Sequence, residues 1–185
     1  MREIWNKIEN YLKENAPNVL ESLQQGATDE EIKKAEDFIG ITFPEDFKES
    51  YKIHNGQCEN QYLNFIGGQE FLSLNEIMGQ WKIWKDIVDS GEFNGLKSNP
   101  IEESIKNDWY NPKWVPITHN GAGDHYCIDL DPNEDSKSGQ IISFWHDFDE
   151  RRLASEGFKK WMKKFADDLE NNKYNIDTEY GLEIE

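Results

Sequence analysis

The chain has 185 residues, of which 36% are hydrophobic and 13% aromatic, and its 20 Lys and Arg stand against 37 Asp and Glu. A chain of this length can fold as one domain without a disulfide framework or a structural metal, and Cys58 and Cys127 form no CxxC pair. The formal net charge of −17 repels nucleic acid and anionic membranes, so we expect a protein partner, no nucleic acid and no membrane.

Three helices are predicted in the first third of the chain. Apolar residues recur at helical spacing from Ile4 to Leu12, which predicts an N-terminal helix within residues 1–27. A capping-box pattern at Thr28 and Glu31 opens a second helix, which Gly40 ends. Pro44 lies at the first turn of a third helix, and the pair at 55–56, Asn-Gly, follows its end.

The middle of the chain carries weaker signals. Residues 62–68 and 70–74 have strand-like composition, and Asn75 is a candidate cap for a helix that runs through Trp81 and Trp84 to Val88. Residues 90–112 are rich in Gly, Pro and Asn and are predicted to form a long loop or insertion, longer than the usual connection.

Strand patterns dominate the next segment. Three β-rich runs, at 113–120, 125–130 and 140–146, predict an antiparallel meander, and Ser155 is a candidate cap for a final helix. The acidic tail, 173–185, is expected to be frayed. Helices, then a meander, then a helix indicate an α+β fold, a single domain over residues 28–172 with a mixed or antiparallel sheet flanked by helices.

The stretch "WVPITHNGAGDHYCIDLDP", residues 114–132, combines His, Asp and Cys and raises three chemical alternatives. A phosphate site is disfavoured, since the Gly-Ala-Gly-Asp turn lacks a P-loop Lys and joins strand to strand. A metal site is disfavoured because strand alternation separates the candidate ligands. Catalysis by Cys127 with His125 is disfavoured because neighbours two apart on a strand lie too far apart to hydrogen-bond. We therefore expect no enzyme, no metal and no cofactor.

A protein-binding surface remains as the fourth alternative. Tyr126, Ile128 and Leu130 are expected to face the core, so the alternating polar residues are expected to face solvent or a partner. Acids interleaved with aromatic residues suit a contact patch for a basic protein. The candidate partner-binding residues are Asp124, His125, Asp129, Asp131, Trp145, Asp147, Asp149 and Glu150.

Three motifs in order resemble the SUKH superfamily, and within it the branch named after the fungal cell-wall-synthesis regulator. They are "FPEDFKESYKIHNG", "WYNPKWVPITHNGAGDHYCIDLDP" and "GQIISFWHDFDERRLASEGFKKWM", and the resemblance extends over residues 28–169. The motif positions assigned a structural role are Pro44, Asn55, Gly56, Trp114, Pro116, Gly121, Gly123, Cys127, Gly139, Gln140 and His146. The chain departs from the pattern in the 90–112 insertion and at Ala154.

The resemblance implies an α+β fold and a role in binding proteins. Bacterial members are similar to immunity proteins that neutralise a cognate polymorphic toxin, often a nuclease, and fungal members act in cell-wall-synthesis signalling. Because nuclease domains are often basic, the acidic charge favours an immunity protein that binds a basic toxin domain. An intracellular scaffold or regulator of cell-wall synthesis is the alternative, and an uncharacterised enzyme is the third. The N-terminus has no apolar signal region, so the expected location is the cytoplasm.

Overall fold

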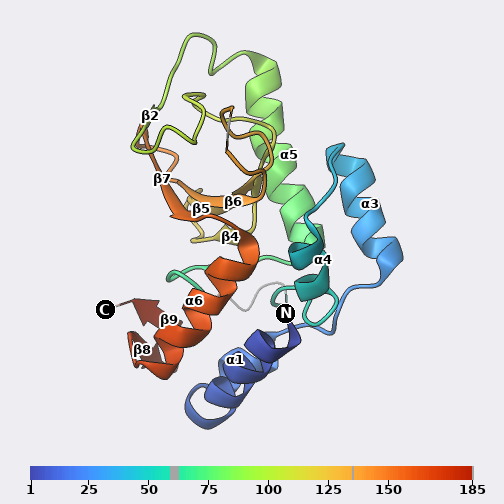
Figure 1. Cartoon of the computed structure of the whole chain (residues 1–185), viewed down its shortest axis with the longest axis vertical. Helices are drawn as coiled ribbons and strands as arrows, with labels where there is room; N and C mark the ends of the chain where they lie inside the picture. Colours follow the sequence, from blue (N-terminus) through green and yellow to red (C-terminus); the bar gives the residue numbers. More distant parts are fainter. Residues whose placement is uncertain (59–62, 135, 185) are drawn as a thin grey trace.

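The computed structural model describes residues 1–58, 63–134 and 136–184. The helices that it describes are α1 (Arg2–Asn15), α2 (Pro17–Ser22), α3 (Asp29–Ile39), α4 (Glu45–Tyr51), α5 (Leu74–Ser90) and α6 (Phe158–Glu170). In Figure 1, α5 runs along one side of the central sheet, and α6 lies below the sheet and runs toward the hairpin at residues 174–184. The predicted α+β class, a single domain with a mixed sheet flanked by helices, is confirmed.

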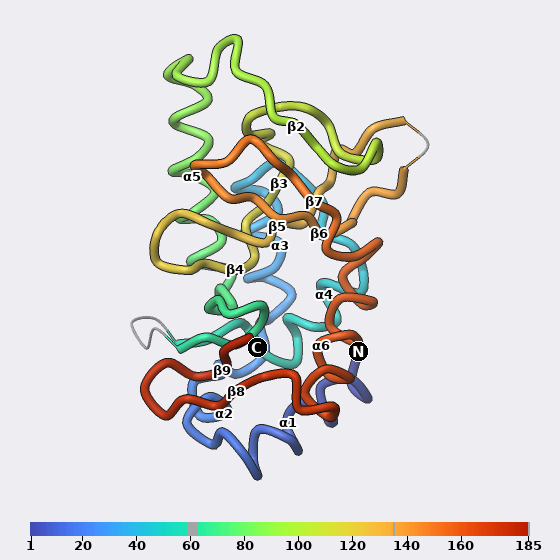
Figure 2. The backbone as a smooth tube through the Cα atoms, turned by 90° about the vertical axis from the view of Figure 1, so that its left-hand side faces the viewer, coloured from blue at the N-terminus to red at the C-terminus, as the bar shows by residue number. Residues whose placement is uncertain are grey.

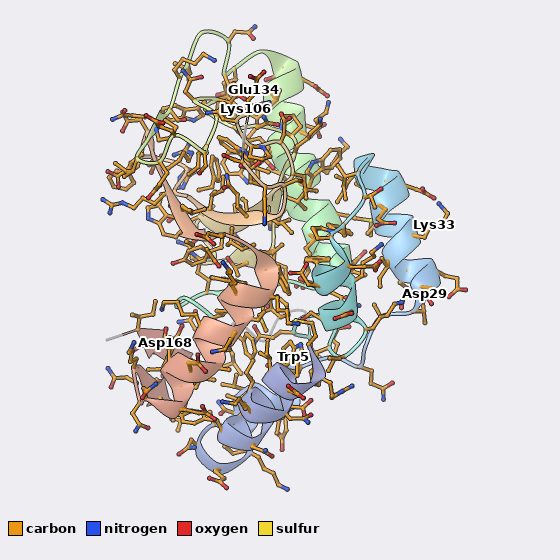
Figure 3. The ribbon with its side chains drawn as sticks, viewed as in Figure 1. Trp5, Asp29, Lys33, Lys106, Glu134 and Asp168 are labelled. Carbon is orange, nitrogen blue, oxygen red and sulfur yellow. The ribbon has the colours of Figure 1, made fainter. Side chains whose placement is uncertain are left out.

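Local capping explains where the helices begin and end. Thr28 and Glu31 form a reciprocal capping box on α3, and Gly40 ends that helix in the left-handed region at φ 79°. α5 begins with a second capping box between Ser73 and Glu76, so its cap lies two residues before the predicted Asn75. Trp5 of α1 points into the interior, whereas Asp29 and Lys33 of α3 point outward (Figure 3).

The central sheet has five strands in the order β2-β7-β6-β5-β3. Its members are β2 (Asn99–Pro100), β3 (Trp114–Pro116), β5 (His125–Asp129), β6 (Gln140–Phe144) and β7 (Glu150–Ser155). All pairs are antiparallel except β2 with β7, which is parallel. Two small ladders accompany it, β1 (Glu70–Phe71) with β4 (Thr118–His119), and β8 (Tyr174–Asp177) with β9 (Gly181–Ile184).

Both faces of the central sheet are buried. Val115, Ile128 and Ile141 face the larger core, which helices α1, α3, α4 and α6 complete. Trp114 and Cys127 face a second core on the opposite side, beneath Trp84 of α5 and residues of the 91–113 segment. The predicted long loop is therefore the cover of the second face, and it contributes the edge strand β2.

Because both faces of the sheet are buried, the predicted exposure of one face of strand β5 is wrong. His125 and Asp129 were expected to face solvent or a partner, but each is 0% exposed, while Tyr126 and Leu130 are only half-buried. The alternation of side chains along a strand shows which residues share a face of the sheet. It does not predict whether a segment distant in sequence covers the second face.

The C-terminal region also differs from the prediction. The segment expected to be a frayed tail forms the β8–β9 hairpin, whose Leu182 is fully buried, and the hairpin lies beside α2 and α6 (Figure 2). Ser155 ends β7 instead of capping the last helix, which begins after Gly157. The expected strand at 62–68 and the polar turn around residue 135 lie partly outside the described residues.

Candidate functional site

Two connections at one end of the β5–β6 pair form the candidate interaction surface. They are the turn Asn120–Asp124, which leads into β5, and the loop Trp145–Glu150, which joins β6 to β7; we call the two together the turn–loop surface. They are adjacent because His125 at the start of β5 pairs with Phe144 at the end of β6. The surface contains five of the predicted partner-binding residues, Asp124, Trp145, Asp147, Asp149 and Glu150.

Asp124 connects the turn to the loop. Its Oδ1 accepts the backbone N–H of His146 at 2.9 Å and lies 2.9 Å from His146 Nδ1, while Asn120 Nδ2 donates to its Oδ2 at 2.8 Å. Burial by itself would raise the pKa of Asp124, but these hydrogen bonds outweigh it and lower that pKa. Gly123 has φ 103°, and a Cβ there would lie 3.3 Å from His146 Nδ1. The Gly-x-Gly-Asp motif therefore positions His146.

The buried side chain of Arg151 hydrogen-bonds to the backbone of the 145–150 loop. Its Nη1 donates to the carbonyl oxygens of Phe148 at 2.6 Å and Glu150 at 2.9 Å, and its Nη2 donates to that of Trp109 at 2.7 Å. The side chain is fully buried, and its guanidinium carbon lies 4.6 Å from the ring centroid of Phe144. Burial lowers the pKa of Arg151 to about 10, so the group stays charged at neutral pH. Sequence reasoning missed this residue, because nothing in an Arg-Arg pair distinguishes the buried member.

The exposed part of the loop is an aromatic side chain between two acids. Phe148 is 64% exposed, the highest value among the large hydrophobic residues recorded as exposed, and Asp147 and Asp149 flank it. The Asp147 side chain is 80% exposed and lies 3.2 Å from His146 Nε2. Trp145 is half-buried, with its ring edge-on to Tyr126 at 5.3 Å. An exposed apolar side chain flanked by two carboxylates is expected in a patch that contacts another protein.

His125 and Asp129 do not belong to this surface. Nε2 of His125 accepts the indole N–H of Trp84 at 2.9 Å, so Nδ1 carries the proton and donates to the Thr118 carbonyl at 2.7 Å. Burial lowers the pKa of His125 to about 3 and keeps it neutral. Asp129 accepts from Gln140 Nε2 at 2.8 Å and from the Asp131 backbone N–H at 2.9 Å. Both side chains join elements inside the protein.

Asp131 lies away from the turn–loop surface. It follows β5, whereas Asp124 precedes it, and seven residues of extended chain span about 23 Å. Asp131 lies 2.7 Å from Lys106 Nζ and accepts from Asn111 Nδ2 at 3.0 Å. It fastens the 91–113 segment to the sheet. The eight candidate residues therefore do not form one face.

Several motif residues contact parts of the chain that are distant in sequence. A Cβ on Gly139 would lie 3.1 Å from Pro44, so the turn before β6 packs on the start of α4. Asn55 accepts the N–H of Leu74 at the start of α5. Gly56 has φ 67° and passes so close to the 72–73 backbone that a Cβ would lie 2.3 Å from it. Gly121, with φ 80°, is exposed in its turn, while Trp114 and Pro116 are buried.

Cys127, which was weighed as a nucleophile beside His125, is buried. Burial raises the pKa of the Cys127 thiol well above its usual range, which keeps the thiol protonated. Within residues 1–58, 63–134 and 136–184, no three His, Cys, Asp or Glu side chains are grouped to hold a metal ion. Over the same residues, no helix is long and apolar enough to cross a membrane.

Comparison with known proteins gives fungal relatives along nearly the whole chain. The chain is 26% identical to the "Cell wall assembly regulator SMI1" of Saccharomyces cerevisiae, over 94% of this chain and 41% of that protein. It is 26% identical to the "Cell wall biosynthesis/cell cycle regulator smi1" of Schizosaccharomyces pombe, over 95% and 37%. It is 22% identical to the "Glucan synthesis regulatory protein" of Neurospora crassa, over 94% and 39%.

These relatives share a domain with the chain rather than a whole architecture, because the chain spans about two fifths of the length of each. A model of the SMI1 / KNR4 family (SUKH-1) matches residues 26–164, which include the turn–loop surface and most of its supports. All of the motif positions, from Pro44 to His146, lie within those residues. The chain belongs to the SMI1/KNR4 (SUKH-1) family.

Proposed function

We propose that this protein is a cytoplasmic immunity protein that binds a basic toxin domain through the turn–loop surface and blocks its activity. The observation that carries the proposal is Phe148, exposed between Asp147 and Asp149 on a loop that the buried Arg151 holds in shape. A rigid loop loses little conformational entropy on binding, so more of the contact energy appears as affinity.

The charge of the protein supports the choice of partner. A net charge of −17 attracts a basic domain over a distance, and the two exposed carboxylates beside Phe148 provide local complementarity. A nuclease domain is such a partner, since its own substrate is polyanionic. The toxin's activity would then be blocked by occupation of its basic surface.

A growth assay tests the proposal. The toxin encoded next to this protein is expressed with and without it, and the wild-type protein should restore growth. Phe148→Ala combined with Asp147→Lys should lose protection, whereas Glu14→Lys, an exposed acid on α1, should keep it. If the neighbouring gene is not toxic, or still kills in the presence of the wild-type protein, the proposal is wrong.

The second candidate is a regulator of cell-wall synthesis, which the names of the fungal relatives favour. In this case the same surface would bind a signalling protein of the host cell. A strain that lacks the chain should become sensitive to a wall-perturbing dye. The wild-type gene should restore resistance and the turn–loop variant should not. Unchanged sensitivity to the dye would count against a regulatory role in cell-wall synthesis. The growth assay with the toxin would then decide whether the protein is an immunity protein.

A further inference from the structure

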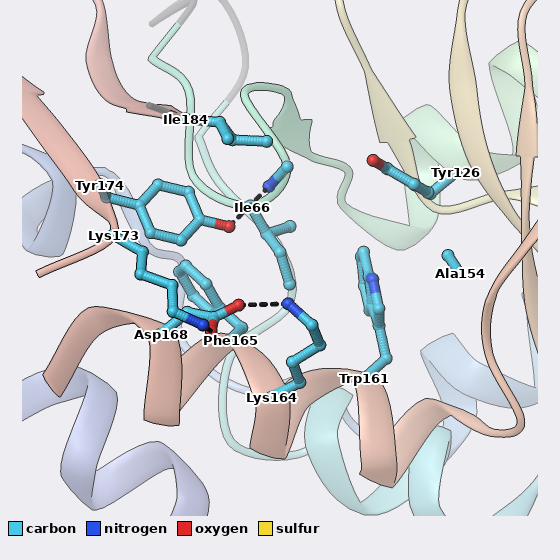
Figure 4. A pocket seen from close by; sticks show the side chains of 11 residues that line it. Ile66, Tyr126, Ala154, Trp161, Lys164, Phe165, Asp168, Lys173, Tyr174 and Ile184 are labelled. Carbon is cyan, nitrogen blue, oxygen red and sulfur yellow. Dashed lines mark hydrogen bonds and ion pairs between the residues drawn. The ribbon is translucent and has the colours of Figure 1, made fainter. Parts of the chain in front are cut away.

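A cavity of about 320 Å³ lies between α6, the β8–β9 hairpin, and Tyr126 and Ala154 of the central sheet. Its walls come from Trp161 and Phe165 of α6, Tyr174 and Ile184 of the hairpin, and Tyr126 of β5 (Figure 4). This volume is at the small end of the range for pockets that bind small molecules. The cavity is separate from the turn–loop surface, although Tyr126 contacts Trp145.

The walls are aromatic and held in place by their surroundings. Tyr126 and Trp161 have ring centroids 5.7 Å apart, and Phe165 and Tyr174 meet edge-to-face at 5.4 Å. The 66–67 turn approaches so closely that a Cβ on Gly67 would lie 2.4 Å from the Tyr126 ring. Because neighbouring groups fix these rings, the space between them does not close by simple rotation of a side chain. Flat rings arranged in this way favour an aromatic guest.

The charged groups of the cavity are gathered on one side. Asp168 accepts a hydrogen bond from Lys173 at 2.8 Å and another from Lys164, opposite the ring of Trp161 (Figure 4). These three are the charged residues recorded in the lining, and two ammonium groups on one carboxylate leave a surplus positive charge. The lysine side chains are 66% and 62% exposed, so each keeps free N–H donors at the rim.

The order of residues on α6 explains this arrangement. Trp161, Lys164, Phe165 and Asp168 follow one another at spacings of three and four, so they form one stripe of the helix. The stripe presents a ring and an ammonium group to the same space. Although the net charge of the protein is −17, an anion bound in this cavity would contact both an ammonium group and an aromatic ring.

We propose that the cavity binds a small carboxylate with one or two aromatic rings. The ring packs against the aromatic walls of the cavity, and the carboxylate accepts from Lys164 at the rim. The proposal does not rest on the toxin or on the turn–loop surface. It predicts selection by both shape and charge, because neither the aromatic walls nor the single surplus charge suffices alone.

Isothermal titration with matched probes tests the proposal. Phenylacetate and indole-3-acetate are compared with indole-3-acetamide and tryptamine, which keep the indole ring and change the charge. We expect one saturable site for the carboxylates with a Kd of about 1 mM or tighter, about tenfold weaker binding of the amide, and the weakest binding of the amine. No saturable binding of either carboxylate, or equal binding of tryptamine, would overturn the proposal.

Two variants locate the site without removing a core side chain. Lys164→Gln should weaken indole-3-acetate about tenfold and leave the amide unchanged, whereas Lys163→Gln, on the neighbouring exposed position, should change neither. Ala154→Leu fills the cavity from β7 and should abolish binding of all probes, with an unaltered far-ultraviolet circular dichroism spectrum showing that the fold is kept. Full binding by the folded Ala154→Leu variant would place the site elsewhere and refute the assignment.

Discussion

Arg151 is a buried cation whose guanidinium group is paired with backbone carbonyl oxygens rather than with a carboxylate. In the part of the chain that the structure describes, no carboxylate lies within ion-pair distance of it, and three backbone oxygens lie within 3 Å. Such an arrangement fixes the backbone of the 145–150 loop directly. Its neighbour Arg152 is 63% exposed and pairs with Glu150, so the two arginines form a natural comparison.

Arg151→Met should lower the free energy of unfolding by about 2–4 kcal/mol, since the loop carbonyls lose their charged donor. Urea denaturation measures this loss, and amide hydrogen exchange should accelerate across residues 145–150. Arg152→Met should cost less than about 0.5 kcal/mol because its ion pair is exposed. Equal costs for the two variants would mean that Arg151 does not hold the loop.

Glu70 is a carboxyl group whose charge state changes near neutral pH. It is half-buried in β1, and burial, with a smaller contribution from Glu76, raises the pKa of its carboxyl to about 7. The folded chain therefore holds this proton more tightly than the unfolded chain does. The stability due to Glu70 is complete below the unfolded pKa and is lost as the pH rises from about 4.5 to about 7.

Glu70→Gln should remove this dependence and stabilise the protein above pH 7 by about 1–2 kcal/mol, allowing for the partial exposure of the group. The measurement is the free energy of unfolding, by urea, of the variant and the wild type at pH 5 and pH 8. Glu92→Gln, at an exposed position after α5, is the control and should change neither value. A variant no more stable than wild type at pH 8 would contradict the raised pKa.

At the scale of elements, local signals predicted helices better than strands. The capping box of α3 and the apolar stripe of α1 lie within a few residues of sequence, so they appear in the sequence directly. The strand β5 is different, because the residues that cover its second face come from α5 and the 91–113 segment. His125 and Asp129 were misplaced for this reason, while Asp124 and Asp147, which flank strands, were placed correctly in connections.

The C-terminal hairpin shows the same limit. Its composition is acidic, yet Leu182 is 0% exposed in the larger core and its N–H donates to the Asn64 carbonyl at 2.9 Å. One apolar side chain in a polar segment is a weak signal. Its burial depends on packing in the larger core, which contains residues of α6 and of the 63–66 segment.

Leu182→Ala should therefore destabilise the protein by about 2–4 kcal/mol, the usual cost of a large-to-small change in a core. Ile184→Ala, two residues later and 55% exposed, should cost less than about 1 kcal/mol. Thermal and urea unfolding of both variants make the comparison. If both costs are negligible, the hairpin is detached from the core and the segment behaves as the frayed tail that its composition indicates.

At the scale of the molecule, the proposed function predicts that charge steers the encounter with a basic partner. The double change Asp147→Lys with Asp149→Lys should slow association with a basic partner about tenfold at low salt and flatten its dependence on salt. Stopped-flow association rates over a range of salt concentrations measure both effects. Glu14→Lys with Asp37→Lys alters the net charge equally but lies on α1 and α3, so it should change the rates much less. Equal effects of the two pairs would mean that total charge, and not the turn–loop surface, steers the encounter.

The sequence by itself determined the α+β class, five of the six described helices, the three central strands, the family resemblance and the strong negative charge. These depend on spacing, capping and composition, which are local or additive. Only the tertiary structure decided that both faces of β5 are buried, that the C-terminal segment is a hairpin and that Arg151 supports the 145–150 loop. Burial and hydrogen-bond satisfaction depend on side chains that are distant in sequence, and the folded chain alone brings them together.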